Sequence, residues 1–145
     1  MDNTVTEMDA TEIKAFLEKQ HSGMLALAND SDAYAIPVSF GTVESDQDIY
    51  FRLGFGPGSQ KRSYLDATDH AAFVAYDRID EGWASIVAIG RPEVFEKDGA
   101  DSAIVQMVDR LDIPFFRVFD RPVEDIDFRL VRLDVQSVRG IVAEG

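Results

Sequence analysis

The stretch MLALANDSDAYAIPVSFGTVESDQDIYFRL (Met24–Leu53) contains three apolar segments separated by short polar turns. Met24–Ala28, Tyr34–Phe40 and Ile49–Leu53 each have the length and the aliphatic or aromatic content of a β-strand. The NDSD turn and the acidic Gly41–Asp48 turn are too short to hold a crossover helix. Consecutive strands joined in this way pair antiparallel, so the stretch predicts an antiparallel sheet.

Pro37 lies inside the second of these strands. Proline has no N–H group to donate to a neighbouring strand, so this position must be an edge, a bulge or a place where the neighbour is not protein. An edge-like strand with exposed backbone groups can hydrogen-bond a flat heteroaromatic ligand. From the residues alone, a bulge and a ligand site both remain open.

The rest of the chain predicts three more strands and three helices. The strands are Ala71–Tyr76, Trp83–Phe95 with a bend at Gly90-Arg91-Pro92, and Phe128–Ile141. The helices are Asp9–Gln20 with Asp9 or Thr11 as its N-cap, Ser59–Ala67 with Ser59 as its N-cap, and Gly99–Leu111. Six strands with few helices indicate a mainly β fold, a small antiparallel barrel rather than a doubly wound sheet.

Length and composition favour one compact domain over residues 1–145, because the chain is 46% hydrophobic and its apolar residues are spread along it. No segment reaches the roughly 18–20 apolar residues of a membrane span. The acidic N-terminus lacks the apolar stretch of a signal peptide, and cysteine is absent, which excludes disulfides. We therefore expect a cytoplasmic protein without a membrane partner.

The charge is strongly negative, with 27 acidic and 14 basic residues and a net charge of -13. Aspartate outnumbers glutamate by 18 to 9, and arginine outnumbers lysine by 10 to 4. Such acidity keeps a protein soluble through mutual repulsion, a property that halophilic proteins use, so we interpret it as a sign of a halophilic cytoplasm. An ordinary acidic protein is the alternative. Either interpretation argues against nucleic-acid binding, which needs a basic face.

The segment GPGSQKRSYL (Gly56–Leu65) places Lys61 and Arg62 side by side against this overall charge. A glycine-rich turn leads here into a helix, whose first turn presents free backbone N–H groups and forms a ready anion site. Ser59 adds a hydroxyl, and Arg52 can reach the same place from the preceding strand. The alternative is that the two cations lie on a solvated helix surface or pair with Asp66 and Asp69.

Other catalytic signatures are missing from the sequence: it has no GxGxxG, Walker, HExxH or GxSxG motif. Its two histidines, His21 and His70, are predicted at element ends, so no metal site is expected. Asp77 and Asp80 fall in a predicted turn and are interpreted as solvated surface residues.

Six blocks of the sequence together resemble the FMN-binding split-barrel superfamily of pyridoxamine 5'-phosphate oxidase. The resemblance is strongest to its short oxidase-related, or nitroimidazole-resistance-like, members. The blocks follow the family's order and spacing over about half of the chain, and they are GMLALA (Gly23–Ala28), YAIPVSF (Tyr34–Phe40), IYFRLG (Ile49–Gly54), GSQKRSYL (Gly58–Leu65), AAFVAY (Ala71–Tyr76) and WASIVAIGRPEVF (Trp83–Phe95).

The resemblance implies a six-stranded antiparallel split β-barrel that forms a homodimer with two FMN molecules at the subunit interface. The strand at Tyr34–Phe40 would lie along the flavin ring, and the following loop and helix would hold the phosphate. The cofactor-binding residues implied for the ring are Ile36, Pro37, Val38 and Ser39; those implied for the phosphate are Arg52, Ser59, Gln60, Lys61 and Arg62; and Trp83 and Ser85 would contact the ring or the partner chain.

The chain also departs from the true pyridoxamine 5'-phosphate oxidases. Those enzymes carry a C-terminal tryptophan and arginine segment, whereas this chain ends RGIVAEG, so the oxidase activity itself is not expected. The segment Gly99–Pro122 is interpreted as an addition of the subgroup. Its aromatic residues Phe115, Phe116 and Phe119 either pack in the core, which we favour, or cover the flavin ring.

The predicted function is that of an FMN-dependent oxidoreductase with a small-molecule substrate and a nicotinamide or similar reductant. The flavin carries the electrons, so the named residues are expected to bind it, and no catalytic acid or base is assigned. A flavin store, carrier or sensor without turnover is the main alternative. Relatives that use a deazaflavin or haem provide a further one, and haem would need His21 or His70 as its axial ligand.

Overall fold

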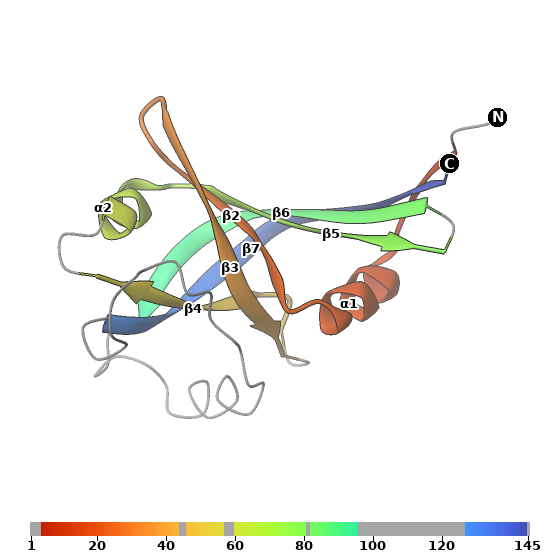
Figure 1. Cartoon of the computed structure of the whole chain (residues 1–145), viewed down its shortest axis with the longest axis horizontal. Coiled ribbons are helices and arrows are strands. Elements are labelled where there is room, and N and C mark those ends of the chain that lie inside the picture. The colour runs from red at the N-terminus through yellow and green to blue at the C-terminus, as the bar shows by residue number, and fades with distance from the viewer. Residues whose placement is uncertain (1–3, 44–45, 57–59, 81, 96–126, 145) are drawn as a thin grey trace.

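The protein is described by a computed structural model over residues 4–43, 46–56, 60–80, 82–95 and 127–144. Within these residues the chain forms seven strands and two helices (Figure 1). The elements are β1 (Val5–Glu7), α1 (Ala10–Lys19), β2 (Ser22–Asn29), β3 (Asp32–Thr42), β4 (Ile49–Phe55), α2 (Gln60–Ala67), β5 (Ala71–Ile79), β6 (Gly82–Phe95) and β7 (Asp127–Glu144). The predicted helix Gly99–Leu111 lies outside the described residues.

All strand pairs are antiparallel, and six of the strands close into a ring. The order is β1-β7-β4-β3-β2-β5-β6, and β6 also pairs with β7. The ring opens on one side because β4 pairs with β7 only as far as Leu133, whereas β6 and β7 remain paired to Glu144. β5, β6 and β7 thus extend from the ring as an arm, and β1 pairs with the end of β7 along it (Figure 1). This arrangement confirms the predicted antiparallel split-barrel fold.

The core follows from the two-residue alternation of the strands. Buried side chains come from the inner face of every strand of the ring, including Leu25, Phe51, Phe73, Ile86 and Leu133, each of which is at most 1% exposed. Their sequence neighbours point outward, as expected for strands with one face on a core. Burying these large side chains provides the main stabilising free energy of the fold.

The six predicted strands are confirmed, and the structure extends them. β5 runs three residues further than predicted, through Ile79, because β6 pairs with it over its whole length. The predicted bend appears as a register shift between Ile89 and Gly90. β1 was not predicted: it has three exposed residues and depends on pairing with β7.

The helix α1 begins where its N-cap predicts. Asp9 accepts a hydrogen bond from the Glu12 backbone N–H at 2.8 Å, and the Glu12 side chain accepts one from the Asp9 N–H at 3.1 Å. This capping box satisfies two N–H groups at the helix start and selects Asp9 over Thr11 as the cap. α1 then covers the open side of the ring, where Ile13 packs against the core near Gly140.

Replacing Asp9 with alanine should lower the free energy of unfolding by about 1 kcal/mol, the usual cost of losing an N-cap. Thr11→Ala serves as the control, because Thr11 lies within the helix and is exposed. Urea denaturation of both variants at one protein concentration measures the difference. Equal losses in the two variants would contradict the assignment of Asp9 as the cap.

Candidate functional site

The described strands β3 and β4 separate soon after they pair. Their register covers only Phe40–Thr42 against Ile49–Phe51, and from there β3 runs up towards its hairpin with β2 while β4 runs towards α2 (Figure 1). Pro37 is exposed in the diverging part of β3, opposite Met24 of β2. Proline is suited to this place, because among the described residues this part of β3 forms no backbone hydrogen bonds with β4 that the missing N–H group would interrupt.

The helix α2 connects the two separated strands to β2. Tyr64 stacks on Tyr34 of β3, with ring centroids 4.8 Å apart. Thr68 exchanges hydrogen bonds with the backbone of Ala28 in β2, each of 3.0 Å. Lys61 donates a hydrogen bond of 2.6 Å to the carbonyl oxygen of Gly54 in β4. The helix therefore bridges the β3–β4 gap, the name used below for the space where the two strands diverge.

Lys61 is buried, with only 5% of its surface exposed. Burial lowers the pKa of its ammonium group, because removal from water disfavours the charged form. Its Nζ also lies 5.7 Å from the centre of the Phe55 ring. Sequence patterns allowed a solvated lysine or an anion-binding lysine, and the structure shows that Lys61 is not solvated.

Of the other predicted phosphate ligands, Arg62 and Gln60 are placed beside this lysine by the structure, whereas no contact joins Arg52 to it within the described residues. Arg62 is also near Phe55, 5.9 Å from its ring centre, and its Nε lies 3.2 Å from Asp66 Oδ1. The pairing of Arg62 with Asp66 was one of the two interpretations of the sequence. Gln60 is exposed as the first residue of α2, and Arg52 is exposed on the outer face of β4. Ser59 lies outside the described residues.

The residues predicted beside the flavin ring lie within β3. Pro37 is exposed and Ile36 is half-buried, whereas Val38 and Ser39 are 2% and 3% exposed. Exposure therefore falls along this part of β3, from the exposed Pro37 to Val38, which belongs to the core.

Trp83 and Ser85 are not brought to the β3–β4 gap within one chain. Both lie near the start of β6, on the arm, while α2 is at the opposite end of the molecule (Figure 1). Trp83 is 50% exposed and lies next to Tyr76, with ring centroids 6.1 Å apart. The two histidines are exposed at element ends, His21 after α1 and His70 before β5.

A charged network on the outside of the barrel was missed by the sequence analysis. Register places Arg132 of β7 between Tyr50 of β4 and Glu93 of β6. Arg132 donates a hydrogen bond of 2.7 Å to Glu93, and the Tyr50 hydroxyl donates one of 2.7 Å to Asp46. The paired positions are far apart in sequence, so no local pattern could have identified them.

The arrangement at the β3–β4 gap is suited to binding rather than to proton transfer. Lys61 and Arg62 at a helix start can hold an anionic group, and the exposed part of β3 at Pro37 lies across the gap from them. Fold and site together define an antiparallel split-barrel protein with a candidate binding site between β3, β4 and α2.

The chain belongs to the pyridoxamine 5'-phosphate oxidase family, because a model of that family matches residues 9–142. No protein of curated function matches the sequence.

Solved structures share the fold. A conserved protein of unknown function from Corynebacterium diphtheriae is 22% identical, covers 96% of this chain and 98% of its own, and has a TM-score of 0.70. An FAD-binding protein from Mesorhizobium loti is 20% identical, covers 94% of this chain and 96% of its own, and has a TM-score of 0.68. A candidate 5-nitroimidazole antibiotic resistance protein from Bacteroides thetaiotaomicron is 14% identical, covers 99% of this chain and 90% of its own, and has a TM-score of 0.72.

Proposed function

We propose that this protein is a flavin-binding oxidoreductase that works as a homodimer with FMN in the β3–β4 gap. The observation that carries the proposal is the buried Lys61 at the start of α2, which is beside Arg62 and in contact with β4. A buried ammonium group costs free energy, and an anion next to it offsets part of that cost. Family membership and FAD binding by a structural relative support a flavin as the ligand.

The residues of this chain would bind and orient the cofactor. Lys61, Arg62 and Arg52 would hold the phosphate, with Ser59 and Gln60 at the helix start. An ammonium group has three donors, and the bond to Gly54 uses one of them. Ile36–Ser39 would present backbone to the flavin ring. The flavin, when bound, transfers electrons between a nicotinamide or similar reductant and a small-molecule substrate.

A homodimer would complete this site. The outer face of β2, β5 and β6 carries exposed apolar side chains on adjacent strands, and register joins Met24 to Val74 and Val74 to Val87. Met24 is 37% exposed, Val87 41% and Tyr76 63%. Contiguous apolar surface of this kind marks interaction sites. A second copy on this face would bring its own Trp83 and Ser85 towards the flavin, which one chain does not do.

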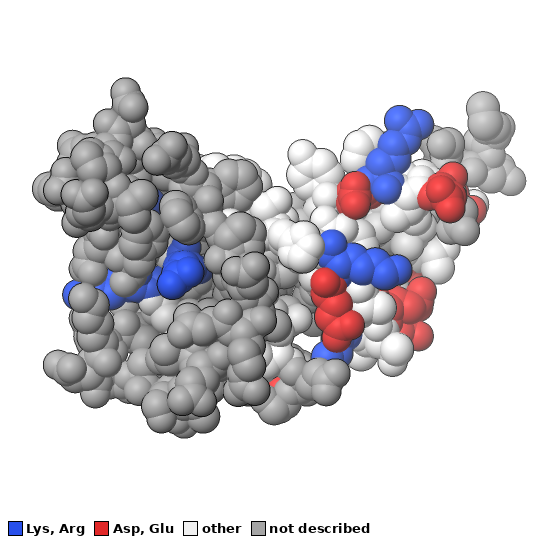
Figure 2. Space-filling model, turned by 60° about the horizontal axis from the view of Figure 1, so that its bottom comes forward, with Lys and Arg blue, Asp and Glu red and all other residues white. Residues whose placement is uncertain are grey.

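We also propose that the protein works in a cytoplasm of high salt concentration. A net charge of -13 supports a cytoplasm of high salt, where repulsion between carboxylates is screened. At the right of the face seen in Figure 2, acidic and basic side chains lie interspersed, whereas basic side chains are visible between the grey atoms at its left. Among the described residues, neither helix is long and apolar enough to cross a membrane.

An absorbance spectrum before and after addition of FMN tests the proposal. Flavin peaks that stay with the protein through gel filtration, and that bleach when NADH or NADPH is added, are the expected result. Parallel titrations with FAD, a deazaflavin and haem identify the cofactor. Bound FMN that no reductant bleaches would favour a flavin store or sensor, and a protein that ignores every flavin would overturn the proposal.

Replacing Lys61 with methionine should weaken FMN binding by about 10- to 100-fold, because one charge-assisted hydrogen bond of roughly 1.5–3 kcal/mol is lost. Stability should change little, since the methionine retains the packing, and relief of the buried charge offsets the lost bond to Gly54. Lys19→Met removes the same charge from the last turn of α1 and is the control. Fluorescence titration of FMN measures both; equal affinities would exclude Lys61 from the phosphate site.

A further inference from the structure

The helix α2 has little apolar surface to fix its position on the strands. It has eight residues, and the buried ones are Lys61 and Leu65. Most helices in a folded protein are held in place by an apolar face that packs on the core. One of the two buried side chains of α2 is charged, so its position must depend on other contacts.

Thr68 ties the C-terminal end of α2 to β2. It is 7% exposed, and its hydroxyl accepts a hydrogen bond of 3.0 Å from the Ala28 N–H. The same hydroxyl lies 3.0 Å from the carbonyl oxygen of Ala28 and 2.5 Å from that of Tyr64. The pairing of β2 with β5 ends at Ala26, so Ala28 lies beyond that ladder. Thr68 thus takes the place of a strand partner for Ala28.

A second contact joins α2 to β3. The rings of Tyr34 and Tyr64 are stacked, with centroids 4.8 Å apart and planes inclined by 15°, and both residues are half-buried. Tyr34 pairs with Leu27 of β2, the neighbour of Ala28. The stack and the Thr68 contact therefore lie at adjacent positions of the β2–β3 hairpin, beside which α2 lies (Figure 1). Two contacts with one hairpin fix the angle of the helix as well as its place.

These contacts connect the two parts of the proposed flavin site. Tyr34 is two positions before Ile36–Ser39, the segment assigned to the ring, and Tyr64 is one helical turn after Lys61. The chain between the ring and the phosphate of FMN has a limited length. One molecule can therefore bind at both ends only if α2 and β3 keep a set separation, and the second contact is lost when the geometry forbids it.

We propose that Thr68, together with the Tyr34–Tyr64 stack, is a positioning residue that holds α2 at a fixed angle to β3, so that ring and phosphate bind at the same time. Because it concerns the same flavin site, this role rests on the proposed function. Thr68 acts through Lys61 and is not itself a contact of the cofactor. Its loss should reduce the affinity that the phosphate adds, while binding of the ring remains.

Fluorescence titrations with FMN and with riboflavin, which has the same ring without the phosphate, test the proposal. The wild type should bind FMN at least about tenfold more tightly. Thr68→Val keeps the shape of the side chain but not its hydroxyl, and Tyr64→Leu removes the stacked ring. Each should lower the FMN affinity about five- to tenfold and change the riboflavin affinity less than about twofold. Thr68→Ser retains the hydroxyl and should rescue the preference for FMN.

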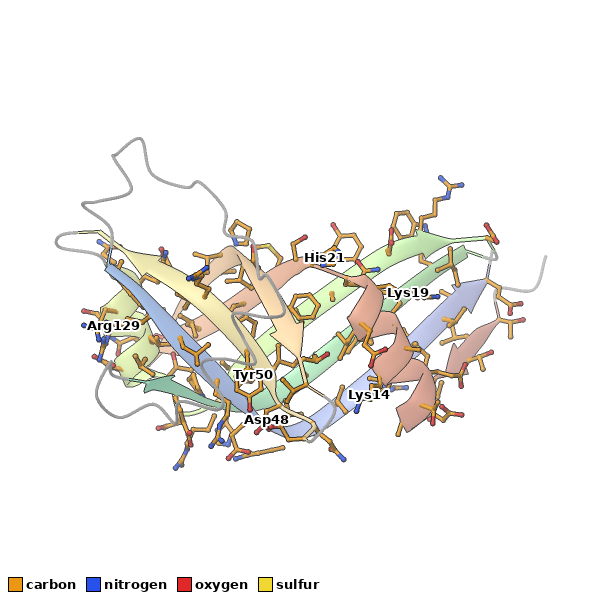
Figure 3. All side chains as sticks on the ribbon, turned by 90° about the horizontal axis from the view of Figure 1, so that it is seen from below. Lys14, Lys19, His21, Asp48, Tyr50 and Arg129 are labelled. Atoms are coloured by element: carbon orange, nitrogen blue, oxygen red, sulfur yellow. The ribbon has the colours of Figure 1, made fainter. Side chains whose placement is uncertain are left out.

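A double variant separates positioning from a general structural role. If Thr68 acts through Lys61, then Thr68→Val should change the FMN affinity of the Lys61→Met protein by less than about twofold. Asp9→Ala, which destabilises the fold at the cap of α1, is the control and should leave the preference for FMN unchanged. α1 is the helix that carries Lys14 and Lys19 (Figure 3), and it lies at the opposite end of the molecule from α2 (Figure 1).

The wild type and the variants together distinguish a failure of this role from a failure of the flavin site. A wild type that prefers FMN, with Thr68→Val and Tyr64→Leu variants that keep the same preference, would refute the positioning role alone. An equal loss caused by Thr68→Val in the wild-type and Lys61→Met proteins would also refute it. A wild type that binds neither ligand would overturn the proposed function and the positioning role with it. If Thr68→Val does not fold, Tyr64→Leu provides the same comparison.

Discussion

Phe73→Ala is expected to lower the free energy of unfolding by about 3–5 kcal/mol, the cost of removing a fully buried aromatic side chain. Phe73 is 0% exposed in β5, and its ring lies 4.8 Å from that of Phe40 and 5.3 Å from that of Phe51. It also fills the space left by Gly23, where an added Cβ would lie 2.6 Å from the ring. The neighbours come from β2, β3 and β4, so collapse cannot close the cavity easily.

The loss should appear as a fall of about 10–20 °C in the unfolding temperature, since each kcal/mol shifts it by a few degrees in a chain of this size. Val5→Ala is the control, because Val5 is 59% exposed in β1 and lies outside the proposed dimer face. Both variants must be compared at one protein concentration if the protein associates. A loss below about 1 kcal/mol for Phe73→Ala would show that this ring is not central to the core.

Features set by neighbouring residues were predicted well. The helix α1 starts at the residue after Asp9 because a capping box is complete within four positions. The turn between β2 and β3 was predicted from NDSD, and Asp30 there adopts a φ of 54°, which aspartate tolerates better than most residues. The six strands were predicted from their apolar segments, because a strand with one face on the core shows its pattern within a few neighbouring residues.

Features set by pairing between distant residues were not predicted. β1 exists because Val5–Glu7 pairs with the end of β7, about 136 positions away, which follows from the register of Thr6 with Val142. The Tyr34–Tyr64 stack depends on where α2 crosses β3. The burial of Lys61 has the same origin: its helix bridges three strands, and a charge pattern cannot show which helix face is covered.

The cations at the start of α2 were foreseen from the sequence, whereas a pocket formed by distant elements was not. Lys61 and Arg62 are adjacent in sequence and follow a glycine-rich loop, so a local pattern indicated an anion site. This pocket is lined by α1, by β7 and by the segment that joins β3 to β4. Within it, Asp48 and Val135 meet only because β4 pairs with β7. A composition as acidic as this one hides such pairs among many solvated carboxylates.

Val87→Asp is expected to convert the proposed homodimer into a monomer and to weaken FMN binding at least tenfold. Val87 is at the centre of the exposed apolar face, between Val74 of β5 and Arg139 of β7. In a dimer formed through this face, each chain would bury one added carboxylate, and removing a charge from water costs several kcal/mol. In the monomer the carboxylate stays in water beside Arg139, whose side chain is 72% exposed, so folding should be retained.

Gel filtration with light scattering, followed by FMN titration, measures both effects on one sample. Thr11→Asp adds the same charge to an exposed position of α1 and should leave the mass and the FMN affinity unchanged. Loss of FMN together with loss of the dimer would support a site built from two chains, since Val87 is in β6, whereas Lys61 is in α2 and contacts β4. A monomeric Val87→Asp that binds FMN like the wild type would place the whole site in one chain. A variant that remains dimeric would show that another face makes the contact.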